Sequence, residues 1–177
     1  MTTPDRARHP LAAAALAALA AVACEATHVT PCPGRPVATL HFRGDPAPGD
    51  GGACSFGADA AVAFTATLSV VGGVTAFLCP DRSEAEPLRG STDGGHVSVS
   101  SSRAAANVPS CACAVQVSES VDGDLVPGDG GVAAFTGAML DHVEATGAGA
   151  CEPDGGAGAA AVCGVPCDLR WELTGTR

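Results

Sequence analysis

Segments in which apolar and polar residues alternate constrain the fold of this chain more than any other feature. In residues 61–71 every second position from Val62 to Val70 is apolar, and threonines and a serine occupy positions between them. Residues 168–174 alternate in the same way around Trp171. Because successive side chains of a strand point to opposite faces, this period of two predicts strands that each bury one face.

Clusters of Gly, Pro and Asp separate these segments and are typical of turns. The predicted strands cover residues 37–43, 61–71, 73–79, 96–102, 111–120, 132–144 and 168–174. About seven short strands of this kind predict an all-β protein, an antiparallel β-sandwich or barrel with Gly/Asp/Pro-rich loops. Residues 89–96 gather Ser, Thr, Asp and Gly, and we interpret them as a turn.

The segment 131–145 fits two periodicities. Val132, Phe135, Met139 and Val143 would share one face of a helix. The same residues also belong to a strand-like run, and a glycine at position 137 would cost a helix about 1 kcal/mol relative to alanine. The sequence therefore favours a strand and leaves a helix as the alternative.

The start of the chain has the layout of an export signal. Residues 11–24 are apolar and uncharged, and Arg6 and Arg8 precede them. A helix needs roughly 20 apolar residues to cross a bilayer, so this run is too short to be a membrane span. Basic residues, a short apolar run and a small-residue cleavage point are typical of a secretory signal, which we assign to residues 1–23.

The residues Ala21-Val22-Ala23-Cys24 resemble the lipobox of bacterial membrane-anchored lipoproteins. The resemblance covers the signal region alone. It implies that Cys24 is acylated and becomes the first residue of the mature protein, with residues 24–36 as lipidated N-terminus and short tether. Residues 37–177 would then form a single β-domain. A soluble periplasmic or secreted protein is the alternative, because Ala21 and Ala23 also suit an ordinary signal-peptidase site.

Nine cysteines occur in the chain. An odd number is unexpected in an exported protein, and assigning Cys24 to the lipid leaves an even set for disulfide bonds. Export and a core rich in small Val and Ala residues both favour such bonds, whose pairing the sequence leaves open. The expected disulfide cysteines are Cys32, Cys54, Cys79, Cys111, Cys113, Cys151, Cys163 and Cys167. Alternatives are a zinc site formed by Cys111, Cys113, Cys163 and Cys167, or a redox-active pair Cys111/Cys113.

Two Asp-Gly segments, residues 44–52 and 122–131, are similar in sequence and are expected to be loops. Calcium prefers several oxygen ligands from closely spaced carboxylates and backbone carbonyls, and these segments would supply part of such a shell. The candidate ligands are Asp45, Asp50, Asp122, Asp124 and Asp129. Neither segment has the ligand spacing of an EF-hand, so solvated turns are the competing interpretation.

The chain carries 19 Asp and Glu residues against 9 Lys and Arg, a net charge of −10. This balance disfavours nucleic acid as a partner. We expect no cofactor and no catalytic site, a membrane contact through the N-terminal lipid, and an unidentified envelope protein or ligand as partner. The sequence thus favours a non-catalytic binding or structural module of the cell envelope. A calcium-dependent binding module and an exported thiol-redox enzyme using Cys111/Cys113 are the alternatives.

Overall fold

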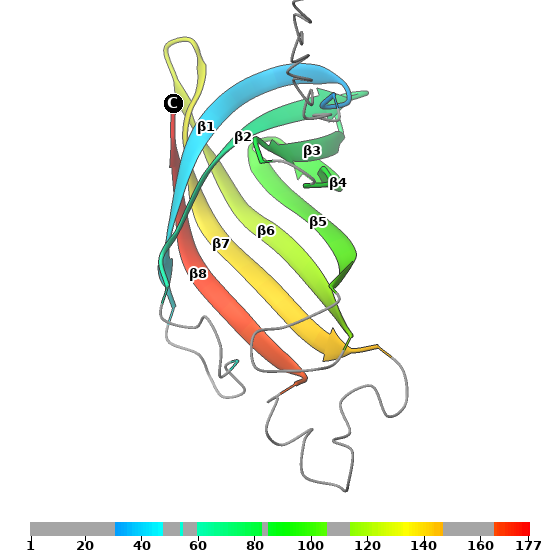
Figure 1. Cartoon of the computed structure of the whole chain (residues 1–177). Helices are drawn as coiled ribbons and strands as arrows, with labels where there is room; N and C mark the ends of the chain where they lie inside the picture. Colours follow the sequence, from blue (N-terminus) through cyan, green and yellow to red (C-terminus); the bar gives the residue numbers. More distant parts are fainter. Residues whose placement is uncertain (1–30, 48–53, 55–59, 83–84, 106–113, 147–164) are drawn as a thin grey trace, which may run out of the picture.

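The computed structural model describes residues 31–47, 54, 60–82, 85–105, 114–146 and 165–177. Antiparallel strands form a closed barrel in which each strand pairs with the next along the chain, and β8 returns to pair with β1 (Figure 1). The strands are β1 (Arg35–Pro46), β2 (Val62–Val71), β3 (Thr75–Pro80), β4 (Leu88–Asp93), β5 (His96–Ala105), β6 (Val115–Gly128), β7 (Gly131–Ala145) and β8 (Cys167–Thr176). The all-β antiparallel prediction is confirmed, and of sandwich and barrel the chain forms the barrel.

The predicted alternation places the expected residues inside. In β8, Trp171 and Leu173 are buried while Arg170, Glu172 and Thr174 are exposed. In β2, Ala66 and Leu68 are fully buried on the inner face. The periodic pattern in these strands therefore identified the core face correctly.

β4 is the strand that the sequence interpretation missed. It lies within the segment 89–96 that we expected to be a turn, and only residues between Asp93 and His96 turn there. Leu88 is buried, and Gly90 lies so close to β5 that an added Cβ would clash with the carbonyl oxygen of Ser98. Leu88 is followed on its face of the strand by Gly90 and Thr92, which conceals β4 from a search for apolar alternation.

Residues 131–145 form β7, so the strand alternative holds. Gly137 pairs with Gly123 of β6, and both positions face the barrel interior. A Cβ added to Gly137 would lie 2.6 Å from the Cα of Gly123 and 2.8 Å from the ring of Phe135. The two glycines therefore leave the space that the Phe135 ring occupies.

An aromatic cluster fills one part of the barrel. The ring of Phe42 stacks on Phe64 at a centroid distance of 5.0 Å and meets Phe135 edge-on at 5.5 Å. Trp171 is buried beside β1, and its indole Nε1 donates a hydrogen bond of 2.9 Å to the carbonyl oxygen of Ala60. These large side chains compensate for the many Ala and Val residues elsewhere in the interior.

Two disulfide bonds fasten the described chain, Cys32–Cys79 and Cys54–Cys167. Four of the expected disulfide cysteines are thus confirmed, and such bonds are consistent with an exported, non-cytoplasmic protein. Cys24, Cys111, Cys113, Cys151 and Cys163 lie outside the described residues. Among the residues that are described, no helix is long and apolar enough to cross a membrane.

The segment just before β1 packs against the barrel. Cys32 is bonded to Cys79 of β3, and the hydroxyl of buried Ser69 donates to the carbonyl oxygen of Pro33. We expected a tether to extend to residue 36, whereas these contacts attach the chain to β2 and β3 from Cys32 onward.

Candidate functional site: a charged cavity inside the barrel

A layer of carboxylates interrupts the apolar interior between β6 and β7. Along these strands the inward-facing pairs are Val117–Val143, then Glu119–Asp141, then Val121–Met139. Ser101 of β5 is paired with Glu119, so three adjacent strands place polar side chains at one level. Apolar clusters lie on both sides of this level. Burial of an ionisable group in such surroundings is costly unless partners compensate for lost water.

Arg82, which follows β3, is the partner of Glu119. Its Nη2 lies 3.1 and 2.9 Å from the two carboxylate oxygens, and it donates to both. The Glu119 side chain is only 4% exposed, whereas that of Arg82 is 46% exposed. The Arg82 guanidinium also lies 5.9 Å from the centre of the Phe64 ring, a cation–π contact. Arg82 therefore links the β2 wall of the barrel to its β6 wall.

Within the described part of the barrel, Asp141 has fewer hydrogen-bond partners than Glu119 to compensate for its burial. Among the described residues its Oδ1 is buried and has no hydrogen-bond partner. Burial, reinforced by the neighbouring charge of Glu119, raises the pKa of Asp141 to about 6, although Arg103 and Arg82 oppose the shift. The opposing effects show that both guanidinium groups act on the same interior space as the two carboxylates.

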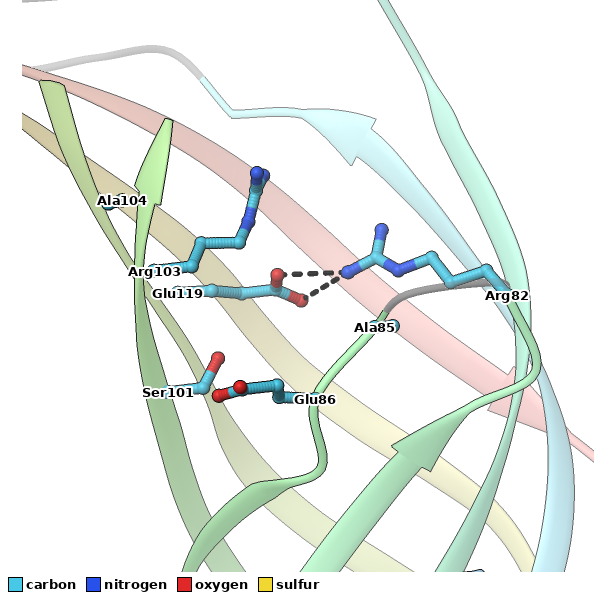
Figure 2. Close-up of a pocket in the computed structure, with 7 residues that line it drawn as sticks. All are labelled: Arg82, Ala85, Glu86, Ser101, Arg103, Ala104 and Glu119. Atoms are coloured by element: carbon cyan, nitrogen blue, oxygen red, sulfur yellow. Dashed lines mark hydrogen bonds and ion pairs between the residues drawn. The ribbon is translucent and has the colours of Figure 1, made fainter. Parts of the chain in front are cut away.

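A cavity of about 420 Å³ opens beside this layer. Its charged and polar lining comprises Arg82, Glu86, Ser101, Arg103 and Glu119 (Figure 2). Figure 2 shows Arg82 reaching Glu119 from the opposite wall, while Arg103 lies beside Glu119 on the neighbouring strand. Glu86 extends across the cavity toward Ser101 in the same view. The cavity therefore presents both hydrogen-bond donors with positive charge and acceptors with negative charge.

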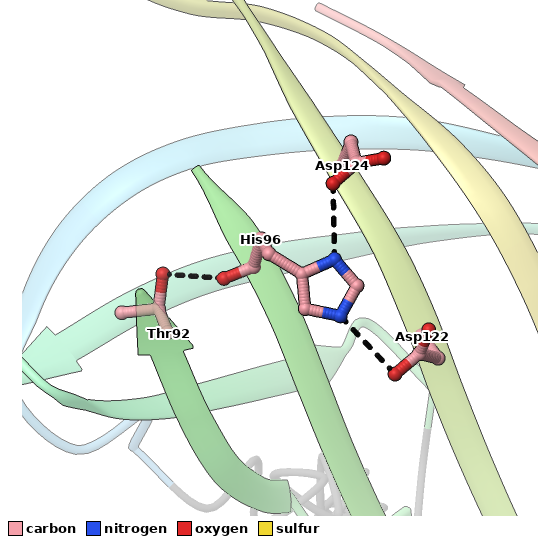
Figure 3. Close-up of polar contacts among 4 residues, drawn as sticks. All are labelled: Thr92, His96, Asp122 and Asp124. Carbon is pink, nitrogen blue, oxygen red and sulfur yellow. Dashed lines mark hydrogen bonds and ion pairs between the residues drawn. The ribbon is translucent and has the colours of Figure 1, made fainter. Parts of the chain in front are cut away.

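Two of the expected calcium ligands are placed differently from our prediction. Asp122 and Asp124 lie on the outer face of β6, not in a loop, because β6 continues as far as Gly128. There they contact His96 of β5: Asp124 Oδ1 is 3.0 Å from Nδ1 and Asp122 Oδ2 is 3.3 Å from Nε2 (Figure 3). The hydrogen bond to Asp124 raises the pKa of His96. These carboxylates thus share a hydrogen-bonding partner of their own on the outer face of the barrel.

The remaining expected calcium ligands are not gathered into one site. Asp129 lies in the turn between β6 and β7, and exposed Asp45 is 3.7 Å from Arg43 on β1. Asp50 lies outside the described residues. Within the described part of the chain, no group of three or more His, Cys, Asp and Glu residues is arranged to hold a metal ion.

The residues of the charged cavity were not singled out from the sequence, although two of them carry a readable signal. Glu119 continues the inner face that Val115 and Val117 begin, and Asp141 lies on the same face as Met139 and Val143. A carboxylate on the apolar face of two neighbouring strands indicates an interior polar site. Arg82, Glu86 and Arg103 lack such a signal, because chain folding alone brings them to the cavity.

No known protein family, curated protein or solved structure matches this chain.

Proposed function

We propose that this protein is an exported, lipid-anchored binding protein of the cell envelope, whose barrel takes one small ligand into the charged cavity. The observation that carries the proposal is the cavity of about 420 Å³, which is lined by charged side chains from β5, from β6 and from the β3–β4 connection. Eight-stranded barrels are wide enough to hold one small ligand, and pockets of roughly 300–1,000 Å³ are typical of small-molecule sites.

The energetics of the carboxylate layer support a binding role. A buried ion pair is often no more stabilising than apolar residues of similar size, and the unpartnered Oδ1 of Asp141 is a further cost. A barrel that needed only stability would be served better by aliphatic side chains at positions 119 and 141. We therefore infer that Glu119, which lines the cavity together with Arg82, serves a polar ligand.

The described lining of the cavity favours binding over catalysis. It offers guanidinium, carboxylate and hydroxyl groups, whose chemistry suits recognition by charge and hydrogen bonding. Export and the Cys24 lipid, both proposed from the N-terminal sequence, would place this cavity outside the cytoplasm and close to a membrane surface.

A cavity-filling substitution tests the proposal. Ser101 lines the cavity, whereas its neighbour Ser100 is exposed on the outer face of the same strand. Ser101→Phe should fill the cavity, and Ser100→Phe is the matched control. The thermal unfolding temperature is measured for wild type and both variants with a panel of neutral sugars, small anions, small cations, zwitterions and apolar compounds at millimolar concentration.

We expect at least one class to raise the unfolding temperature of wild type and of Ser100→Phe, and to have no effect on Ser101→Phe. Stabilisation by a ligand is expected because a compound that binds only the folded state shifts the unfolding equilibrium. An equal effect on all three proteins would place binding elsewhere, and no effect of any class on wild type would contradict the proposed function.

A further inference from the structure

We infer that the ligand of the charged cavity is a small zwitterion, a molecule that carries one carboxylate and one ammonium group, such as a free amino acid or a dipeptide. This inference rests on the proposed function and names its substrate class. Three features support it: the separation of charge across the cavity, the internal pairing of Arg82 with Glu119, and the size of the space.

The cavity is lined by a cation, Arg103, and an anion, Glu86, that do not form an ion pair with each other. Arg82 and Glu119 already neutralise one another through two short hydrogen bonds. Among the described residues, neither Arg103 nor Glu86 takes part in an ion pair, so their charged ends are also too far apart to pair together. Both residues nevertheless line the same cavity. A ligand with two opposite charges would bridge them.

Arg103 and Glu86 also come from different parts of the barrel. Arg103 lies near the end of β5, and Glu86 belongs to the connection between β3 and β4 (Figure 2). A guanidinium binds a carboxylate through two parallel N–H donors, and a carboxylate accepts hydrogen bonds from an ammonium. We therefore assign the ligand carboxylate to Arg103 and the ligand ammonium to Glu86, with the Ser101 hydroxyl between them.

A ligand with a single charge fits this lining less well. A simple anion would gain from Arg103 but would leave Glu86 without a partner, and a simple cation would leave Arg103 without one. Like charges at close range disfavour the wrong partner, so the arrangement selects against both. The volume of about 420 Å³ lies near the lower end of the range for small-molecule sites and suits a compact ligand.

Titration calorimetry with matched probes tests the inference. L-alanine and L-alanyl-L-alanine carry both charges, propionate lacks the ammonium group, and ethylamine lacks the carboxylate. We expect one of the two zwitterions to bind wild-type protein at least tenfold more tightly than propionate and ethylamine. A tenfold difference in affinity corresponds to about 1.4 kcal/mol of binding free energy.

Charge-neutralising variants locate the contacts. Arg103→Gln and Glu86→Gln should each weaken zwitterion binding at least tenfold. The controls are Arg89→Gln, which lies on the outer face beside Phe77, and Glu144→Gln, which is exposed near the end of β7. Both controls should bind as wild type does, because their side chains lie outside the cavity. Urea unfolding of all four variants identifies any variant whose fold is lost.

Each other outcome overturns the inference in a distinct way. Propionate that binds as tightly as the zwitterions would indicate an anion site, and ethylamine that does so would indicate a cation site. Zwitterion binding that survives Arg103→Gln and Glu86→Gln would place the ligand elsewhere. Absence of zwitterion binding, together with stabilisation by another class in the panel above, would overturn the zwitterion and leave the proposed function standing.

Discussion

Glu119 of β6 and Asp141 of β7 are cross-strand neighbours inside the barrel, and their carboxylates differ in hydrogen bonding. Glu119 accepts two hydrogen bonds from Arg82, whereas Oδ1 of Asp141 has no partner among the described residues. Two adjacent carboxylates that are largely buried repel one another when both are ionised. The pair therefore links the stability of the barrel to the protonation of Asp141.

The raised pKa of Asp141 predicts that its contribution to stability falls as pH rises. The folded protein binds this proton up to about pH 6, whereas the unfolded chain releases it near 3.8. Between these values the folded state holds more protons, so its stability decreases with increasing pH. Asp141→Asn removes this effect and should stabilise the protein by about 2 kcal/mol at pH 7.5 relative to wild type.

Urea unfolding at pH 4.5 and 7.5 measures this effect. The gain from Asp141→Asn should be largest at pH 7.5 and should shrink at pH 4.5, where Asp141 is itself largely protonated. Glu144→Gln, an exposed change on the same strand, should leave the pH dependence as in wild type. A gain of the same size at both pH values would show that charge on Asp141 is not its cause.

Removal of Arg82 should lower the free energy of unfolding more than neutralisation of Glu119 does. Arg82→Met leaves a carboxylate that is 4% exposed without its guanidinium, and we expect a loss of about 3 kcal/mol in the free energy of unfolding. Glu119→Gln leaves a guanidinium that is half in solvent, with an expected loss of about 1 kcal/mol. The double variant should be more stable than Arg82→Met alone, since the charge of Glu119 that Arg82→Met leaves uncompensated is then removed. Denaturant unfolding of the three variants at pH 7.5 measures the coupling, and independent additive losses would contradict it.

Gly137 is expected to tolerate no side chain. A methyl group at this position would meet the Cα of Gly123 at 2.6 Å and the Phe135 ring at 2.8 Å, so Gly137→Ala should cost about 2 kcal/mol or more. Gly130→Ala is the control, because its added Cβ would have only Arg177 within 4 Å, at 3.6 Å. Thermal unfolding distinguishes the two, and equal changes in the two variants would contradict a steric clash at Gly137.

The proposed lipid anchor predicts a defined mature N-terminus. Intact-mass analysis of protein from detergent-solubilised membranes should give a chain that begins at Cys24 and carries a diacylglyceryl group. Cys24→Ser should abolish the added mass and release the protein from the membrane fraction. A mature chain with an unmodified Cys24 would support soluble export, and a chain that retains residues 1–23 would contradict export.

The sequence predicted the strands best where each strand has one apolar and one polar face. Alternation located the core side of β2 and β8, and Gly137 favoured a strand for β7. It missed β4, whose Gly, Ser, Thr and Asp residues are those of a turn, and it treated Asp122 and Asp124 as loop residues because Asp and Gly also favour turns. In β6 these residues lie on the outer face, while Gly123 between them allows close approach to β7.

The candidate site was less predictable than the fold. Glu119 and Asp141 lie in phase with buried apolar residues, so their strands contain a signal for them. Arg82 and Glu86 belong to the β3–β4 connection and Arg103 to β5, and only the closure of the barrel brings them to the same cavity as Glu119. The sequence left the pairing of the cysteines undetermined for the same reason, since Cys54 and Cys167 are 113 positions apart in the chain.

The Cys32–Cys79 bond has a mechanical consequence. It encloses β1, β2 and β3 in one covalent loop. Tension applied to the chain ahead of Cys32 therefore reaches the end of β3 through the sulfur–sulfur bond. Pulling on the N-terminus cannot extend the backbone of β1 and β2 until that bond is reduced.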